Sequence, residues 1–210
     1  GAFYTVAETD IVILTQFGKQ VGEPITEPGL HFKTPFVQDI NRLDKRVMEF
    51  DGDATEMPTK DKTYIEVDTF ARWRIGDATK FFVALRDERS ARSRLEDIIG
   101  SEVRTAVASH PLIEVIRSDK SRQLPSPQQE QGTTVTVPAT AERGRLALQS
   151  DVLAAAKPKL LQWGIELLDV RIKRVNYHKS VVNNIYARMI SERQQIAQRF
   201  RSEGEGEAAR

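Results

Sequence analysis

Cysteine is absent from the 210 residues, and histidine occurs only three times. The absence of cysteine excludes disulfides, thiolate metal sites and cysteine nucleophiles, although it does not identify a cellular compartment. His31, His110 and His178 stand far apart, and none has a second ligand at helical or hairpin spacing. We therefore predict no metal site and interpret the histidines as surface or turn residues.

The short motifs of common enzyme classes are also missing. The sequence contains no G-x-x-x-x-G-K-[ST], no G-x-G-x-x-G and no G-x-S-x-G, which removes the usual phosphate loops and the nucleophile elbow. The carboxylates of FDGDATE (Asp51, Asp53 and Glu56) lack the twelve-residue calcium pattern, so we interpret them as a solvated turn. A membrane-associated hydrolase would require a constellation that no motif reveals.

Neither sign of charge is in excess. Thirty-one basic residues face 30 acidic ones, and the net charge is +1, so no global field attracts nucleic acid. The densest basic cluster, RDERSARSR at 86–94, is diluted by Asp87 and Glu88 and carries no interleaved aromatic for base stacking. We interpret it as the exposed start of a helix and expect no nucleic-acid partner.

Long apolar runs are missing as well. No stretch reaches the roughly 18 apolar residues of a membrane span, and no secretory leader pattern is visible. The chain nevertheless begins at Gly1 and enters directly on the apolar GAFYTV. We expect it to be a fragment whose upstream residues are missing.

The first half of the chain has the pattern of strands and turns. IVILTQFGKQ at 11–20 suits a strand that enters a turn at Gly18, and Pro28 and Gly29 suit a type II turn. An antiparallel meander is the predicted result. TYIEVDTFARWRI at 63–75 alternates apolar and polar residues with period two, which is a strong strand pattern.

Helical patterns follow. Asp77 is a plausible N-cap for a short helix, and Ser90 opens a longer one that His110-Pro111 ends. Residues 123–142 are rich in proline and polar residues, which predicts an exposed, mobile loop. Another helix is predicted from about residue 144, with Pro158 as a kink or restart.

Gly164 then marks the end of that helix, and a strand follows in IELLDVRIKRV at 165–175. In this strand Leu168, Val170 and Ile172 alternate with charged residues, and we expect them to share the buried face. The organisation predicted is α+β: a β-rich part, an α/β part and a terminal helix.

The terminal helix is heavily charged and has little to bury. Its apolar residues form a narrow stripe at three-, four- and seven-residue spacing: Val182, Ile185, Met189, Ile196 and Phe200. Past Phe200 the stripe ends, and two glycines are expected to fray the helix unless further helix or partners hold it. We interpret the tail as an assembly element and the root of a longer coiled coil. Packing against its own domain is the alternative.

The same segments carry a family resemblance. EPGLHFKTPF, EVDTFARWRI followed by DATKFF, WGIELLDVRIKRVNY and above all IYARMISERQQIAQRFRSEGEGEA resemble the SPFH (stomatin, prohibitin, flotillin, HflK/HflC; band 7) superfamily. Within it, the resemblance is closest to the bacterial HflC family. It covers nearly the whole chain and is weakest at 123–150.

The resemblance implies a domain organisation. It assigns 1–88 to a β-rich, membrane-proximal SPFH subdomain, 89–178 to an α/β SPFH subdomain, and 179–210 to the start of a coiled-coil helix. It also implies a single N-terminal membrane span upstream of Gly1, in a bacterial inner membrane, with the domain on the periplasmic side. No catalytic residue and no cofactor are expected.

The resemblance further implies a partner set. Members of the HflC family alternate with an HflK-like sister subunit in a large membrane-anchored ring or cage that encloses and regulates an FtsH-like membrane protease. Self-association and contact with membrane lipid belong to the same picture. A stomatin-like, lipid-organising scaffold without a protease partner is the alternative.

Two groups of site residues follow. In this picture Phe3 and Tyr4 lie next to the membrane span, and Leu30, Phe32 and Phe36 contact lipid headgroups, although inward-facing strand residues would explain the last three equally well. The predicted oligomer interface is on the tail, where four charged residues are expected to set register and partner choice between subunits: Arg188, Glu192, Arg193 and Arg199. Its residues are Ile185, Met189, Arg193, Ile196 and Phe200.

Overall fold

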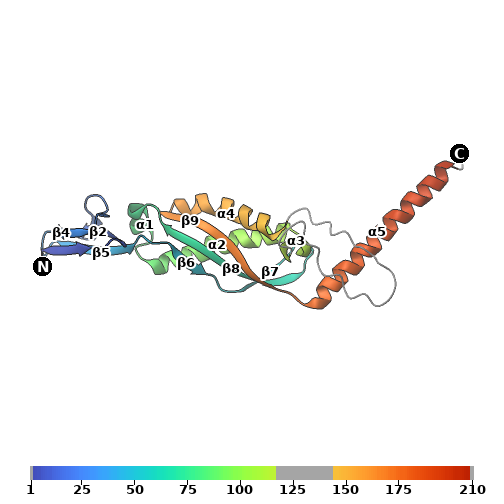
Figure 1. The fold of residues 1–210 in the computed structure, drawn as a ribbon, viewed down its shortest axis with the longest axis horizontal. Coiled ribbons are helices and arrows are strands. Elements are labelled where there is room, and N and C mark those ends of the chain that lie inside the picture. The colour runs from blue at the N-terminus through green and yellow to red at the C-terminus, as the bar shows by residue number, and fades with distance from the viewer. Residues whose placement is uncertain (1, 117–143, 209–210) are drawn as a thin grey trace.

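The computed structural model describes residues 2–116 and 144–208. The elements lie along one long axis, with the N-terminus at one end and the helix α5 (Lys179–Ala208) projecting from the other (Figure 1). Strands dominate the first part of the chain and helices follow, so the predicted α+β class is confirmed. The loop predicted at 123–142 lies outside the described residues.

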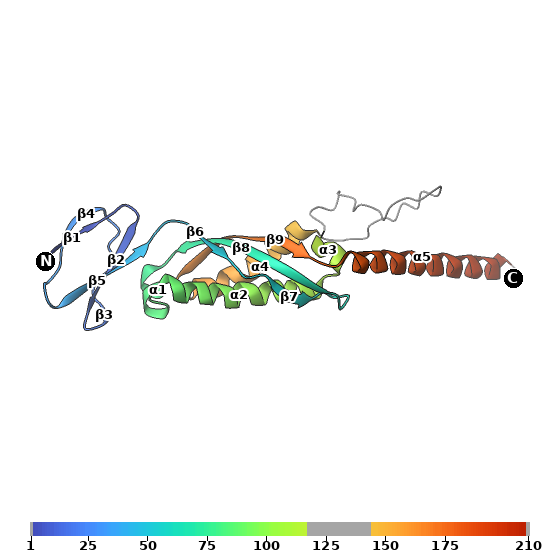
Figure 2. The ribbon, with the colours of Figure 1, turned by 90° about the horizontal axis from the view of Figure 1, so that it is seen from below.

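Antiparallel strand pairs build the N-terminal end. β1 (Phe3–Val6) pairs with β4 (Gly29–Phe32), while β2 (Asp10–Gln16) lies between the short β3 (Lys19–Gln20) and β5 (Gln38–Asp44). The predicted meander is therefore wrong, because β1 pairs with β4 and not with the next strand in the sequence, β2. Bringing these distant strands together creates a two-stranded ribbon at the extreme end of the molecule (Figure 2).

The two predicted turns have different outcomes. Gly18, with φ of +79°, follows Phe17 in the tight turn between β2 and β3, as the sequence predicts. Gly29 also has a positive φ, of +134°, but it pairs with Val6 as the first residue of β4 and forms no type II turn. The positive φ of Gly29 was predicted correctly, but its place in a type II turn was not.

The main sheet is centred on β8 (Tyr64–Ile75). β9 (Ile165–Asn176) pairs along one side of β8, and β6 (Met48–Asp51) and β7 (Thr55–Pro58) share the other side. The predicted alternation in β8 is confirmed. Its buried face consists of Ile65, Val67, Thr69, Ala71, Trp73 and Ile75. Because this sheet joins strands from both sides of residues 88 and 89, it ties the two predicted subdomains together, and their division stays a prediction.

β9 departs from the simple alternation that the sequence suggests. Its register against β8 shifts at two places, one of which leaves Leu168 without a partner between Leu167 and Asp169. Each extra residue reverses which side chains face the core. The residues buried on β9 are therefore Ile165, Leu167, Val170 and Ile172, and Leu168 is only half-buried. The prediction that Leu168 shares the face of Val170 is wrong for this reason.

Helices cover one face of the sheet, and the two long ones are α2 (Glu88–Ser109) and α4 (Arg145–Leu161). α1 (Ala78–Ala84) begins at the predicted cap, where the Asp77 carboxylate accepts a hydrogen bond from the Lys80 backbone N–H. α2 (Glu88–Ser109) begins earlier than predicted, because Asp87 caps it by accepting from the Ser90 N–H. α3 (Leu112–Ile116) is a single short helix that follows Pro111.

α4 (Arg145–Leu161) runs through Pro158 without a break, so the predicted restart does not occur. The turn that follows is tightly packed: Gly164 has a φ of +72°, and a Cβ placed there would lie 2.3 Å from the Asp77 carbonyl oxygen. Glycine is therefore required at position 164, in the turn that connects α4 to β9.

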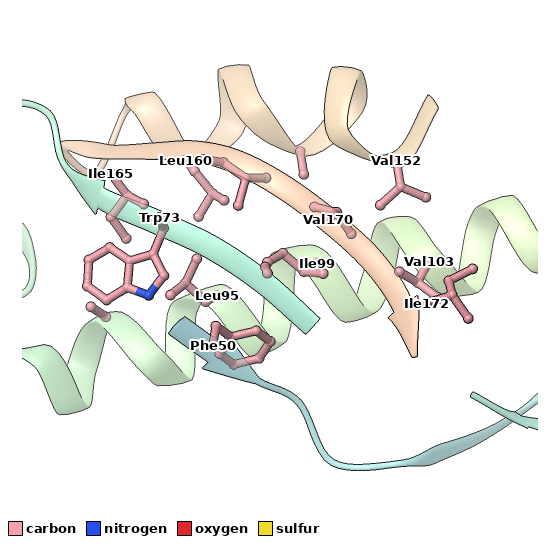
Figure 3. Packing of buried hydrophobic residues seen from close by; sticks show 14 of the residues in the cluster. Phe50, Trp73, Leu95, Ile99, Val103, Val152, Leu160, Ile165, Val170 and Ile172 are labelled. Carbon is pink, nitrogen blue, oxygen red and sulfur yellow. The ribbon is translucent and has the colours of Figure 1, made fainter. Parts of the chain in front are cut away.

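The core lies between the sheet and these two helices. Figure 3 shows the side chains of Trp73 on β8 and Val170 on β9 directed toward Leu95 and Ile99 on α2 and toward Leu160 on α4. A second, smaller cluster of Tyr4, Val6 and Val12 holds the N-terminal strands together. The polar face of the sheet carries cross-strand ion pairs, among them Arg74–Glu166 at 2.6 Å. The body thus consists of two layers, a sheet and its covering helices, and the ribbon and α5 lie at its two ends.

Candidate interaction surfaces

The histidines and the potential metal ligands of the described residues make local contacts. No group of three or more potential metal ligands occurs within 2–116 and 144–208. His31 stacks on Tyr4 and lies 2.9 Å from the Glu27 carbonyl oxygen, His110 lies 2.7 Å from that of Ala106, and His178 lies beside Ser180. His31 thus lies in β4 opposite Tyr4, His110 lies at the C-terminal end of α2, and His178 precedes α5.

The carboxylates of FDGDATE are likewise surface groups, with Asp51 at the end of β6, Asp53 between the strands and Glu56 in β7. Asp51 accepts hydrogen bonds from the Lys173 ammonium group at 2.9 and 3.1 Å, and Asp53 and Glu56 are exposed. The hydrogen bond to Asp51 raises the pKa of Lys173. This pair links the edge of β6 to β9 and therefore serves the fold.

One face of the β1–β4 ribbon is apolar and open to solvent. The register places Phe3 opposite Phe32, with ring centroids 5.6 Å apart in an edge-to-face contact, and Thr5 opposite Leu30. Because successive strand residues alternate, these side chains share one face. Phe3, Leu30 and Phe32 are 67%, 68% and 62% exposed. The ribbon thus presents three large apolar side chains at the N-terminal end of the molecule.

Phe36 extends this apolar character into the turn that follows β4. It is fully exposed and has a φ of +66°, a conformation that is uncommon for residues other than glycine. Hydrogen bonds hold the turn in place: the Thr34 N–H donates to the Gln38 side chain, and the Lys33 N–H donates to the Ala2 carbonyl. A bulky aromatic is therefore held outward by a well-defined backbone. We call Phe3, Leu30, Phe32 and Phe36 the apolar tip.

Tyr4 does not belong to the apolar tip. It lies on the opposite face of β1, is only 6% exposed, and packs in the small cluster with Val6 and Val12. Burial raises the pKa of its phenol, against a weaker opposing effect of the Arg42 charge. The alternation that exposes Phe3 is what buries Tyr4.

The alternative interpretation of Leu30, Phe32 and Phe36 as inward-facing core residues is wrong, because all three are exposed. Sequence reasoning also missed Phe17, which is 87% exposed in the β2–β3 turn with a φ of +50°. The only hint was its position before Gly18 in the predicted turn.

The base of α5 is attached to the body. Tyr186 is 6% exposed, and it lines a small apolar pocket with Ile185 and with Leu112, Ile113 and Ile116 of α3. The Arg188 guanidinium lies 3.8 Å from the Asp61 carboxylate. The first turns of α5 therefore pack against their own chain, as the alternative interpretation of the tail proposed.

The rest of α5 has no such contacts within the described residues. Every residue from 191 to 206 is exposed, and Ile196 and Phe200 are 54% and 69% exposed. The predicted oligomer stripe is thus divided: Ile185 and Met189 are half-buried near the body, while Arg193, Ile196 and Phe200 point to solvent. The side chain of Val182 lies outside the described residues.

The charges on α5 pair within the helix. Arg199 donates to Glu203 at 2.9 Å, and Arg188 lies 3.9 Å from Glu192, both at the i,i+4 spacing that stabilises helices. Fraying past Phe200 is not observed, since α5 continues through Gly204 and Gly206 to Ala208. Among the described residues, Arg193 forms no salt bridge.

None of the helices in the described part of the chain combines the length and apolar character of a membrane span.

Comparison with protein-family models places residues 4–206 in the SPFH domain / Band 7 family. The chain belongs to the SPFH domain / Band 7 family. The match covers the ribbon, the two-layer body and almost all of α5. The resemblance seen in the sequence is therefore confirmed for this SPFH domain.

Three relatives show the branch of the family that this SPFH chain resembles. "Protein HflC" of Treponema pallidum (strain Nichols) is 36% identical, over 99% of this chain and 66% of the relative. "Protein HflC" of Borreliella burgdorferi is 32% identical, over 96% and 64%. "Modulator of FtsH protease HflC" of Escherichia coli (strain K12) is 30% identical, over 98% and 68%. The chain spans about two thirds of the length of these relatives.

Proposed function

We propose that this SPFH chain is the folded domain of a non-enzymatic, HflC-like scaffold subunit that is anchored in a bacterial inner membrane. It assembles with itself and with an HflK-like sister subunit into a large ring or cage, and the assembly regulates an FtsH-like membrane protease. The name of the Escherichia coli relative, a modulator of FtsH protease, supports the protease partner.

The observation that carries this proposal is the separation of two unlike surfaces at opposite ends of the molecule. The apolar tip lies at the N-terminal end, and the exposed part of α5 projects from the other end (Figure 1). An apolar, aromatic surface suits the interface of a bilayer. A long helix whose apolar residues are unburied suits contact with parallel neighbours.

The proposal keeps the division of the chain that the family resemblance implies. In this proposal residues 1–88 lie near the membrane, 89–178 form the second SPFH subdomain, and 179–210 begin the coiled coil. The domain lies on the periplasmic side, and a single N-terminal span precedes it. Phe3, Leu30, Phe32 and Phe36 rest on the lipid surface, and Tyr4 supports them from inside the fold.

The test is the mass and composition of the particle that the complete protein forms in its native membrane. The protein would be extracted gently through an affinity tag, sized by mass photometry, and its partners identified by mass spectrometry. A megadalton particle with an SPFH sister and a membrane protease supports the proposal. A small homo-oligomer that carries lipid but no protease contradicts it and favours a stomatin-like scaffold, a reading that the apolar tip alone also supports.

A further inference from the structure

A connection of two residues joins α5 to the body. β9 ends at Asn176 and α5 begins at Lys179, and the exposed Tyr177 and His178 between them belong to neither element. α5 then runs for 30 residues, which is about 45 Å at a rise of about 1.5 Å per residue. A change of about 10° in its direction at the base would move its far end by about 8 Å. The contacts at the base of α5 consequently decide where its exposed residues lie.

Asp61 joins three separate parts of the chain at this base. It lies in the turn between β7 and β8, and its Oδ2 accepts a hydrogen bond of 3.0 Å from the backbone N–H of Leu112, the first residue of α3. Its Oδ1 lies 3.8 Å from the guanidinium of Arg188 on α5, and the Asp61 side chain is only 19% exposed. The two oxygens of one carboxylate therefore face two different helices.

The turn that carries Asp61 is held by backbone hydrogen bonds. The Thr59 N–H donates to the Thr63 carbonyl at 2.9 Å and closes the turn around Asp61. The Lys60 N–H donates to the His110 carbonyl at 3.0 Å and ties the turn to the end of α2. The Asp61 carboxylate is thus anchored to the body from both sides.

Arg188 lies between two carboxylates. Its guanidinium is 3.8 Å from Asp61 on the body and 3.9 Å from Glu192, which lies one helical turn further along α5. Both distances exceed that of a hydrogen bond, and the Arg188 side chain is 56% exposed. Only the pair with Asp61 connects α5 to the body, since the pair with Glu192 stays within the helix. A small rotation of the Arg188 side chain exchanges one pair for the other.

An apolar contact completes the attachment. Tyr186 is 6% exposed in the small apolar pocket, where Leu112 is one of its neighbours on α3. Leu112 is also the residue whose N–H bonds to Asp61. The polar and the apolar contacts at the base of α5 therefore meet at the same end of α3.

We propose that Asp61, Arg188 and Tyr186 form a latch that fixes the direction of α5. The latch is closed in this structure, with Arg188 facing Asp61. When Arg188 turns to Glu192, the apolar contact alone holds α5, and the helix pivots about the two-residue connection. The inference rests on the proposed function only for its consequence, which is that the direction of α5 sets the shape of the assembly.

The cysteine-free sequence makes a direct measurement available. Ser101 on α2 and Gln198 on α5 are both exposed, so each accepts a spin label without disturbing the core. Ser101→Cys and Gln198→Cys would be combined in the complete protein, with any cysteine beyond these 210 residues replaced by serine. Labelled subunits would be diluted with an excess of unlabelled ones, so that double electron–electron resonance reports the distance within one chain.

We expect one narrow distance distribution in the parent. Asp61→Asn keeps an oxygen that accepts the Leu112 N–H but removes the charge that faces Arg188, and it should at least about double the width of the distribution. Arg188→Gln should have the same effect, and the double variant should be no broader than either, because each change removes the same contact. Unchanged width in both single variants would overturn the latch, and so would a broad distribution in the parent.

Glu192→Gln is the matched control. It removes the carboxylate that competes for Arg188, so the distribution should be as narrow as in the parent or narrower. Broadening equal to that of Asp61→Asn would mean that Arg188 acts only through the stability of α5, which contradicts the proposal. Arg188→Gln leaves the bond between Asp61 and Leu112 intact, so it carries the test if the melting temperature of Asp61→Asn falls. The predicted broadening in a parent particle of small mass would support the latch and contradict the proposed function.

Discussion

Phe3 and Phe32 meet edge to face across the β1–β4 ribbon, with ring centroids 5.6 Å apart, yet both rings remain about two-thirds exposed. The contact orders two aromatic side chains without burying them. An ordered apolar surface of this kind is typical of a site that another phase or partner covers. Its position at the N-terminal end of the molecule is the reason that we propose a bilayer as its occupant.

The apolar tip should therefore bind lipid. The double substitution Leu30→Ser and Phe32→Ser should lower the partitioning of the chain onto phosphatidylcholine vesicles at least about tenfold, because each large apolar side chain contributes about 1.5–3 kcal/mol when it leaves water. Vesicle flotation measures this. Val83→Ser on α1, where Val83 is 67% exposed, is the matched control and should leave partitioning unchanged.

Stability separates the lipid contact from a role in folding. Exposed positions usually change the free energy of unfolding by no more than about 0.5 kcal/mol, and urea titration of the double variant should show this. Equal flotation of the variant and the parent would rule out the apolar tip as the lipid contact.

The exposed part of α5 should mediate association without stabilising the body. Ile196→Ser and Phe200→Ser together should shift the parent particle toward smaller species in analytical ultracentrifugation, because both side chains lose apolar area that only a neighbour buries. Gln194→Ser, an exposed polar change on the same helix, is the control. A variant particle of unchanged size would place the assembly contacts elsewhere.

Two glycines should respond to alanine in opposite directions. Gly164→Ala should destabilise the chain by more than about 1 kcal/mol, because the left-handed backbone is unfavourable for alanine and the new Cβ collides with the Asp77 carbonyl. Gly100→Ala should instead stabilise it by roughly 0.5–1 kcal/mol, since α2 gains a better helix former in open space. Urea unfolding of both variants checks the pair, and a stabilising Gly164→Ala would contradict the structure.

Acid should weaken the link between β8 and β9. The hydrogen bond from Arg74 holds the pKa of the Glu166 carboxyl below its ordinary value. A depressed folded pKa means that the stabilisation is present above the unfolded pKa, about 4.3, and is lost as pH falls through the folded value.

Glu166→Gln should therefore be less stable than the parent at neutral pH, and the two unfolding free energies should converge in acid. Glu56→Gln, an exposed carboxyl without a salt bridge among the described residues, should run parallel to the parent. A constant difference between parent and Glu166→Gln from pH 7 to pH 3 would show that the pair contributes nothing specific.

The contrast between β8 and β9 shows where sequence patterns are sufficient. The burial of β8 follows directly from its period-two pattern, because the strand pairs on both sides without interruption of its own alternation. In β9 the register shifts next to Leu168 and Lys173, and each shift changes the face of all later residues. A bulge depends on pairing with a distant strand, so the local pattern could not reveal it.

The residues of β1 and of α5 show the same contrast between local pattern and tertiary contact. That Phe3 and Tyr4 point in opposite directions follows from strand alternation, but which of them is buried depends on β2 and its neighbours in the small cluster. Similarly, the apolar stripe on α5 was visible in the sequence. Which of its residues are buried and which are exposed depends on the contact between Tyr186 and α3.

The sequence by itself determined the α+β class, the Asp77 cap of α1, the end of α2 at His110, the long terminal helix and the family, because these depend on local periodicity, turn chemistry and motifs. Only the tertiary structure decided the pairing of β1 with β4, the exposure of the apolar tip, the bulges of β9 and the contacts of Asp61 with α3 and α5. Each of these joins residues that are far apart in the chain, and long-range contacts are settled by packing and hydrogen bonding of the whole fold.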